Sequence, residues 1–130
     1  MVRLLILAAM LFASGLPVFA QSPEARFGSA TRITATTGEG IYADLCQGCH
    51  MAGGVGAIGA GAYPALAQNP KLVSADYLLA MVIHGRKGMP PLGGLLNDEQ
   101  VAAVSNFVRN HFGNAYPDPV TAQAAQAARQ

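Results

Sequence analysis

The chain has 130 residues, a formal net charge of +1 and two cysteines. This length allows one domain and excludes a second of ordinary size. The nearly balanced charge, with no run of basic residues, gives no support to nucleic-acid binding.

The first 20 residues have the pattern of a secretory signal peptide. Arg3 provides a basic start, an apolar run covers residues 4–13, and Pro17 precedes a cleavage site of small residues that ends at Ala20. An uncleaved membrane anchor is the alternative, but a spanning helix needs about 20 apolar residues, twice the length of this run. We therefore expect cleavage at residue 20 and a periplasmic protein without a stable membrane span.

After the signal, residues 21–36 are polar and small with no hydrophobic period, which predicts a flexible lead. Thr36 and Glu39 then have the spacing of a capping box, which marks a helix start. Apolar residues recur at helical intervals from there, so we expect a helix over about 38–48. These residues are Ile41, Tyr42, Leu45 and Cys46.

At the end of this helix the chain reads Cys46-Gln47-Gly48-Cys49-His50, which includes both cysteines. C-x-x-C-H is the attachment pattern of a c-type haem. Residues three and four apart share one face of a helix, so both thiols and the imidazole point the same way. Cys46 and Cys49 can then form thioethers with the haem vinyl groups, and His50 can bind the iron as proximal ligand.

A C-x-x-C pair also has other uses. A thioredoxin-like redox couple needs a βαβ context, which the flanking sequence lacks. A zinc site needs a second pair of ligands, and the sequence contains no such cluster. A disulfide would be stable in an exported protein, but the histidine directly after the second cysteine favours haem.

The next stretch, residues 51–63, is almost all glycine and alanine, and its five glycines exclude a stable helix. Two interpretations are open: a loop that passes close to a flat cofactor, or a plain flexible loop. A short turn is expected over residues 63–67. No segment of the chain has the alternating pattern of a strand.

Two further helices are expected in the second half of the chain. Ser74 is a suitable N-cap and Gly85 a suitable end for a helix over about 75–84. Asn97 caps a strongly amphipathic helix that stops at Gly113, and residues 86–96 between these helices form a loop.

The folded domain therefore covers residues 37–113, and residues 114–130 form a disordered or weakly helical tail. A body of this size is small for a self-sufficient apolar core. A buried haem would supply the missing apolar surface. We expect an all-α fold, with three main helices and Gly/Pro-rich loops wrapped around one covalently bound haem.

The second axial position on the iron needs another ligand, and Met89 is the candidate. It lies in Gly88-Met89-Pro90-Pro91, where proline keeps the preceding residue extended and stiffens the loop after it. His84 and His111 compete, although a histidine near a helix C-terminus more often interacts with the dipole. The other methionines lie in the signal, beside the proximal ligand or on an apolar helix face: Met10, Met51 and Met81.

Together these features resemble class I c-type cytochromes over residues 37–113. The matching parts are C-x-x-C-H on a first helix, Y-P-x-L from Tyr63, G-M-P-P around Met89 and a terminal amphipathic helix. Two positions of the first helix and two of the last also match the residues through which these helices cross in the family: Gly38, Tyr42, Val104 and Phe107.

The resemblance implies a cytochrome c fold in which these two helices pack at a steep angle. It also implies that the second nitrogen of His50 donates to the backbone carbonyl of Pro64, because ligating imidazoles usually have such a partner. Residues 83–100 look like single-haem modules that serve periplasmic dehydrogenases, including cytochrome subunits of alcohol- and sugar-oxidising enzymes. Those subunits often carry three haems, whereas one motif here implies one haem.

Two protein ligands would leave the iron no open position for a substrate. The sequence therefore predicts an electron-transfer protein and not an enzyme, which carries single electrons from a dehydrogenase to the respiratory chain. Its partners would be a donor dehydrogenase and an acceptor oxidase or other cytochrome. For Arg86 and Lys87 three interpretations are open: a docking patch for a partner protein, a contact with a haem propionate, or two solvated cations.

Two other functions stay open. In the first, Met89 is displaceable and the haem protein acts as a peroxidase or as a gas or redox sensor, which carbon monoxide binding would reveal. In the second, the chain is a haemless, disulfide-bonded adaptor, which a negative haem stain would reveal.

Overall fold

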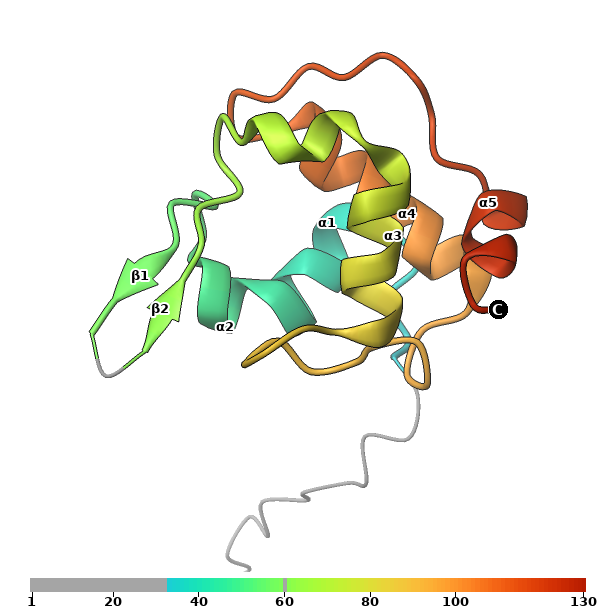
Figure 1. Cartoon of the computed structure of the whole chain (residues 1–130), viewed down its shortest axis with the longest axis horizontal. Coiled ribbons are helices and arrows are strands. Elements are labelled where there is room, and N and C mark those ends of the chain that lie inside the picture. The colour runs from blue at the N-terminus through green and yellow to red at the C-terminus, as the bar shows by residue number, and fades with distance from the viewer. Residues whose placement is uncertain (1–32, 60) are drawn as a thin grey trace, which may run out of the picture.

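The structure is a computed structural model that describes residues 33–59 and 61–130. The expected signal peptide and most of the lead lie outside the described residues. The described part is mostly helical, as expected (Figure 1). Its elements are α1 (Gly38–Ile41), the π-helical η1 (Tyr42–Cys46), α2 (Gln47–His50), β1 (Ala57–Ile58), β2 (Ala62–Tyr63), the 3₁₀-helical η2 (Pro70–Val73), α3 (Ala75–His84), α4 (Asp98–Asn110) and α5 (Ala122–Ala127).

The first three elements form one continuous helical stretch, slightly longer than predicted. Its N-cap is Thr37, whose hydroxyl accepts a hydrogen bond from the Gly40 amide at 3.1 Å. The predicted capping box of Thr36 and Glu39 is therefore wrong by one residue. Two adjacent threonines offer the same capping chemistry, and only the backbone shows which one stands outside the helix.

The helical stretch crosses α4 at Gly38. A Cβ atom on this residue would collide with the carbonyl oxygen of Ala103 and with the Cβ of Phe107, so only glycine allows this approach. One turn further on, the rings of Tyr42 and Phe107 lie 5.5 Å apart. The expected contact with Phe107 is present, whereas Ala103 takes the place expected for Val104 at the glycine.

Helices α3 and α4 begin where the sequence predicted. The Ser74 hydroxyl accepts from the Tyr77 amide at 3.1 Å, and Asn97 forms a complete capping box with Gln100. Gly85 ends α3 with a φ of 67°, a conformation that favours glycine. Helix α4 ends at Asn110, three residues before Gly113.

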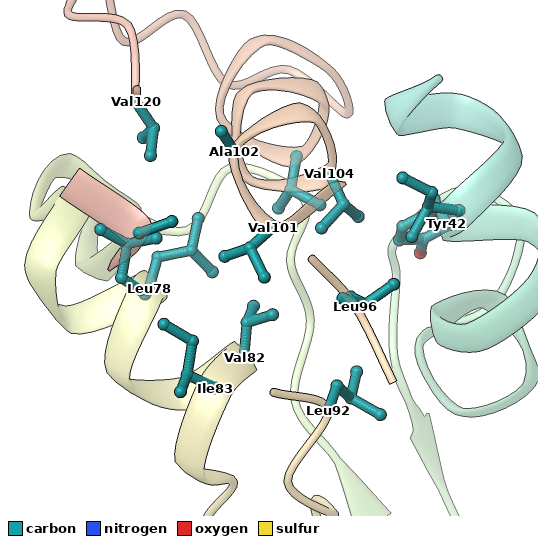
Figure 2. Packing of buried hydrophobic residues seen from close by; sticks show 14 of the residues in the cluster. Tyr42, Leu78, Val82, Ile83, Leu92, Leu96, Val101, Ala102, Val104 and Val120 are labelled. Atoms are coloured by element: carbon teal, nitrogen blue, oxygen red, sulfur yellow. The ribbon is translucent and has the colours of Figure 1, made fainter. Parts of the chain in front are cut away.

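The apolar core lies between α3 and α4 and continues toward the first helical stretch (Figure 2). Val82 and Ile83 of α3 face Val101 of α4. Leu92 and Leu96, from the loop between these helices, also point into this core and are only 8% and 3% exposed. The loop that contains Met89 is thus anchored at its far end by two leucines.

A short hairpin interrupts the glycine-rich stretch, which the sequence did not predict. Ala57 pairs with Tyr63 and Ile58 with Ala62, in antiparallel register. Strands of two residues are too short to show an alternating pattern in the sequence.

Both ends of the described chain pack on α4, and the tail, expected to be disordered or weakly helical, forms the short helix α5 there. The Gln100 side-chain amide donates to the carbonyls of Ile33 and Ala35 at 2.9 and 2.8 Å. In the tail, Val120 and the α5 residue Ala125 are buried. An alanine-rich helix has little apolar pattern, because its buried and exposed faces carry the same side chain. Within the described part of the chain, no helix has the length and apolar character needed to cross a membrane.

Candidate functional site

The two thiols and the imidazole of the motif lie on the end of the first helical stretch. Cys46 is the last residue of η1, and Cys49 and His50 belong to α2. Both thiols are free; Cys46 is half-buried and Cys49 is exposed. The π-helical turn before Cys46 was not predicted, and such turns occur often at functional sites.

Burial changes the acidity of one of the two thiols, Cys46. Burial raises the pKa of the Cys46 thiol to about 11, and the neighbouring Cys49 contributes in the same direction. The thiolate is the form that binds metals and takes part in thiol redox chemistry, so burial lowers this reactivity at Cys46, whereas Cys49 is exposed. Moreover, no group of three or more His, Cys, Asp or Glu that could hold a metal ion occurs within residues 33–59 and 61–130.

The buried His50 ring has one defined hydrogen-bond partner. Its Nδ1 lies 2.9 Å from the carbonyl oxygen of Pro64. A carbonyl can only accept, so Nδ1 carries a hydrogen, and in the neutral imidazole Nε2 then has the lone pair. This is the orientation and tautomer of a metal-ligating imidazole, and it joins the two residues that the family resemblance paired.

One glycine, Gly56, allows the Pro64 carbonyl to reach this position. Gly56 donates its amide to the His50 carbonyl at 3.1 Å and has a φ of 70°. A Cβ on Gly56 would collide with the carbonyl oxygen of Tyr63 and lie 2.8 Å from the Pro64 carbonyl carbon. The close approach of two backbone segments therefore requires this glycine, which neither interpretation of the glycine-rich loop had included.

One hydrogen bond and one unusual backbone conformation define the chain just after His50. The Tyr42 hydroxyl donates to the carbonyl of Met51 at 2.7 Å, and burial, together with the nearby Cys46, raises the pKa of this phenol above its ordinary value. Met51 itself has a φ of 64° and a ψ of 160°, a conformation that is rarely adopted by residues other than glycine. Apart from the aromatic residue on the helix, nothing in the sequence indicates either feature.

An apolar pocket adjoins the Pro64 carbonyl. It is lined by residues 55–58 and 62–65, which belong to the hairpin and the turn after it. Several apolar side chains around it are open to solvent: Val55 at 65%, Ile58 at 95% and Tyr63 at 41% exposure. These exposed side chains make the mouth of the pocket apolar.

Met89 lies on a separate loop whose backbone is tightly fixed. Its amide and carbonyl each bond to Arg86 at 3.0 Å, and Leu92 and Gly93 donate to the last turn of α3. The Met89 side chain is half-buried against the core. Figure 1 shows this loop running below α2 from the end of α3. Among the described residues, no hydrogen bond joins the loop to the Cys46–His50 segment.

The competing ligands have other partners. His84 Nε2 lies 2.8 Å from the carbonyl of Ala128, and His111 stacks on Phe107 with ring centroids 4.1 Å apart. Both imidazoles are exposed, as are Arg86 and Lys87. These contacts leave Met89 as the candidate for a second axial ligand.

The donor set fits a covalently attached haem. Two free thiols stand three residues apart, the adjacent imidazole has an available Nε2, and an apolar pocket lies beside its hydrogen-bond partner. Assignment of Cys46, Cys49, His50 and Met89 to haem stays a prediction.

Comparison with known proteins is consistent with this fit. Residues 34–108 match the family described as cytochrome c oxidase, cbb3-type, subunit III. The gluconate 2-dehydrogenase cytochrome c subunit of Pantoea cypripedii is 34% identical over 106 residues, covering 72% of this chain and 24% of that protein. The fructose dehydrogenase cytochrome subunit of Gluconobacter japonicus is 30% identical over 119 residues, covering 80% and 24%.

A shorter relative is similar over most of its own length. A cytochrome c-552 of Thermus thermophilus is 30% identical over 99 residues, covering 64% of this chain and 65% of that protein. In contrast, the chain spans about a quarter of the length of the two dehydrogenase subunits. The family match covers more than half of the chain and contains the C-x-x-C-H motif and Met89. The chain therefore belongs to the cytochrome c oxidase cbb3-type subunit III family, whose members are class I c-type cytochromes.

Proposed function

We propose that this cytochrome is a periplasmic carrier of single electrons, from a dehydrogenase to the respiratory chain, with one covalently bound haem. Cys46 and Cys49 form the thioethers, and His50 and Met89 bind the iron. The observation that carries this proposal is the hydrogen bond from His50 Nδ1 to the Pro64 carbonyl, which leaves Nε2 free as a ligand. Haem bound there would supply an Fe(III)/Fe(II) couple that exchanges one electron at a time.

The chain's own groups set the conditions for this exchange. The Pro64 carbonyl fixes the imidazole orientation and increases its basicity as a ligand. A thioether opposite the imidazole raises the reduction potential above that of a bis-histidine site. With both axial positions filled by protein, no open position remains for a substrate, which supports a carrier over an enzyme.

The donor and the location rest on separate observations. Two relatives are cytochrome subunits of gluconate and fructose dehydrogenases, which supports a dehydrogenase as donor. The signal-like pattern of residues 1–20 supports export to the periplasm.

The proposal is tested by intact-mass analysis and a redox titration of the exported protein. We expect a chain that begins near Gln21, carries the mass of one haem and titrates as a one-electron couple. A Cys46→Ser and Cys49→Ser double variant should lose the covalent haem. Carbon monoxide binding to the reduced native protein would instead favour the peroxidase or sensor function, and a chain without haem mass would overturn both.

A further inference from the structure

The tail after α4 reaches back to the loop that carries Met89, through a single arginine. Arg129 Nη1 donates to the Gly93 carbonyl at 2.6 Å, and Nη2 donates to the Leu96 carbonyl at 2.8 Å. Its Nε also bonds to the Asp98 carboxylate at 2.5 Å, in the first turn of α4. One guanidinium therefore connects the end of the loop to the start of the next helix, using donors in a fixed planar arrangement.

A second tail contact lies at the other end of the same loop. The carbonyl of Ala128 is 2.8 Å from Nε2 of His84, the last residue of α3. Helix α5 is held in position for both contacts because Ala125 is fully buried against the core. Residues 128 and 129 thus contact both sides of the segment 85–96, and Figure 1 shows the C-terminus beside the chain that leads into α4.

The loop has few other side-chain restraints. Within the described part of the chain, Arg129 is the only residue whose side chain hydrogen-bonds to the backbone of residues 86–96. The remaining restraints are backbone bonds, including Gly93 to Ile83 at 3.1 Å, and the buried side chains of Leu92 and Leu96. Gly93 is therefore held on one side by α3 and on the other by the tail, four residues after Met89.

We propose that the C-terminal tail is a latch that holds the Met89 loop closed, with Arg129 as its positioning residue. This inference rests on the proposed role of Met89 as a haem ligand. Releasing Arg129 would free two loop carbonyls and let the segment between Met89 and Leu96 move. The state in which Met89 has left the iron would then be more populated, although the ligand itself is unchanged.

The test compares Arg129→Ala, Arg129→Lys and Lys71→Ala in the intact haem protein. Lys71 is exposed on η2, so its replacement removes one positive charge away from the loop and serves as control. Two quantities are measured for each variant: hydrogen exchange of peptides that cover residues 86–96, and the fraction of protein with Met89 off the iron, from the absorbance and the rate of carbon monoxide binding.

We expect Arg129→Ala to raise loop exchange and to increase the Met-off fraction roughly tenfold, the size expected for loss of charged hydrogen bonds. Arg129→Lys keeps the positive charge but loses the planar set of guanidinium donors. Its loop exchange and Met-off fraction should lie between those of Arg129→Ala and the native protein. Lys71→Ala should match the native protein.

Unchanged loop exchange in Arg129→Ala would overturn the latch. Faster loop exchange with an unchanged Met-off fraction would show that Arg129 restrains the loop but does not help to hold Met89 on the iron. That result would overturn the proposed positioning role. A Met89→Ala variant with the native spectrum would instead overturn Met89 as ligand, which separates failure of the proposed function from failure of the latch.

Discussion

The two segments proposed to bind iron are held in place in different ways. His50 is fixed by contacts within residues 42–67: the Pro64 carbonyl, the Gly56 amide and the tyrosine hydroxyl that bonds to Met51. The Met89 loop depends on α3 and on a tail residue 40 positions further along the chain. The hydrogen bonds around His50 are therefore local, although Tyr42 also packs on Phe107 of α4, whereas the distal side is only complete once the C-terminus has packed. We expect the distal side to be the one that opens first.

The largest effect should come from Met89→Ala, which removes the proposed distal ligand. We expect a lower reduction potential and rapid binding of carbon monoxide, because the thioether no longer occupies the iron. Met81→Leu, a volume-conserving change of a half-buried methionine on α3, is the control and should leave both quantities unchanged. Spectroelectrochemistry and carbon monoxide binding measure the two effects; native behaviour of Met89→Ala would reassign the ligand.

Glycine-to-alanine changes perturb each side separately. Gly56 and Gly85 both have positive φ, at 70° and 67°, and a Cβ on either would collide with a backbone carbonyl. We expect each variant to lose about 2–4 kcal/mol of unfolding free energy, from strain and overpacking. Denaturant unfolding measures the loss, and Gly88→Ala, whose Cβ would meet no atom within 4 Å, is the control.

The two variants should differ in how they affect the ligands. Gly85→Ala displaces the Met89 and Pro91 backbone and should increase the Met-off fraction. Gly56→Ala displaces the peptide that accepts from His50 and should shift the potential while Met89 stays bound. Equal loss of Met89 ligation in both variants would break the distinction between a local and a long-range side.

The smallest effect is expected from Tyr42→Phe on the proximal side. This change removes the hydroxyl that donates to the Met51 carbonyl and leaves the rings of the aromatic cluster in place. Loss of one hydrogen bond to a half-buried carbonyl should cost about 1–2 kcal/mol of unfolding free energy. Thermal unfolding measures this, and a loss above that of Gly56→Ala would contradict the ranking.

The same division explains what the sequence could predict. The caps at Ser74 and Asn97 and the end at Gly85 were predicted correctly, because each depends on a few neighbouring residues. The C-x-x-C-H motif is equally local. Pro64 needed the family resemblance, since nothing in the residues themselves indicates which of many carbonyls lies beneath an imidazole 14 positions away.

The features that were missed depend on contacts across the chain. Arg129 is one cation in an alanine- and glutamine-rich tail, and its three acceptors lie 31 to 36 positions earlier. Gly56 resembles its neighbouring glycines in sequence, and only the close approach of the Tyr63 carbonyl distinguishes it. The hairpin and the π-helical turn are too short to produce a period.

The crossing at Gly38 also sets an order of assembly. This glycine touches Ala103 and Phe107, so the first helix cannot bury its small face until α4 has been synthesised. Closing such a long stretch of chain is slow compared with forming either helix alone. The C-x-x-C-H segment at the end of the same helical stretch would therefore lack the support of α4 until this long-range crossing has formed.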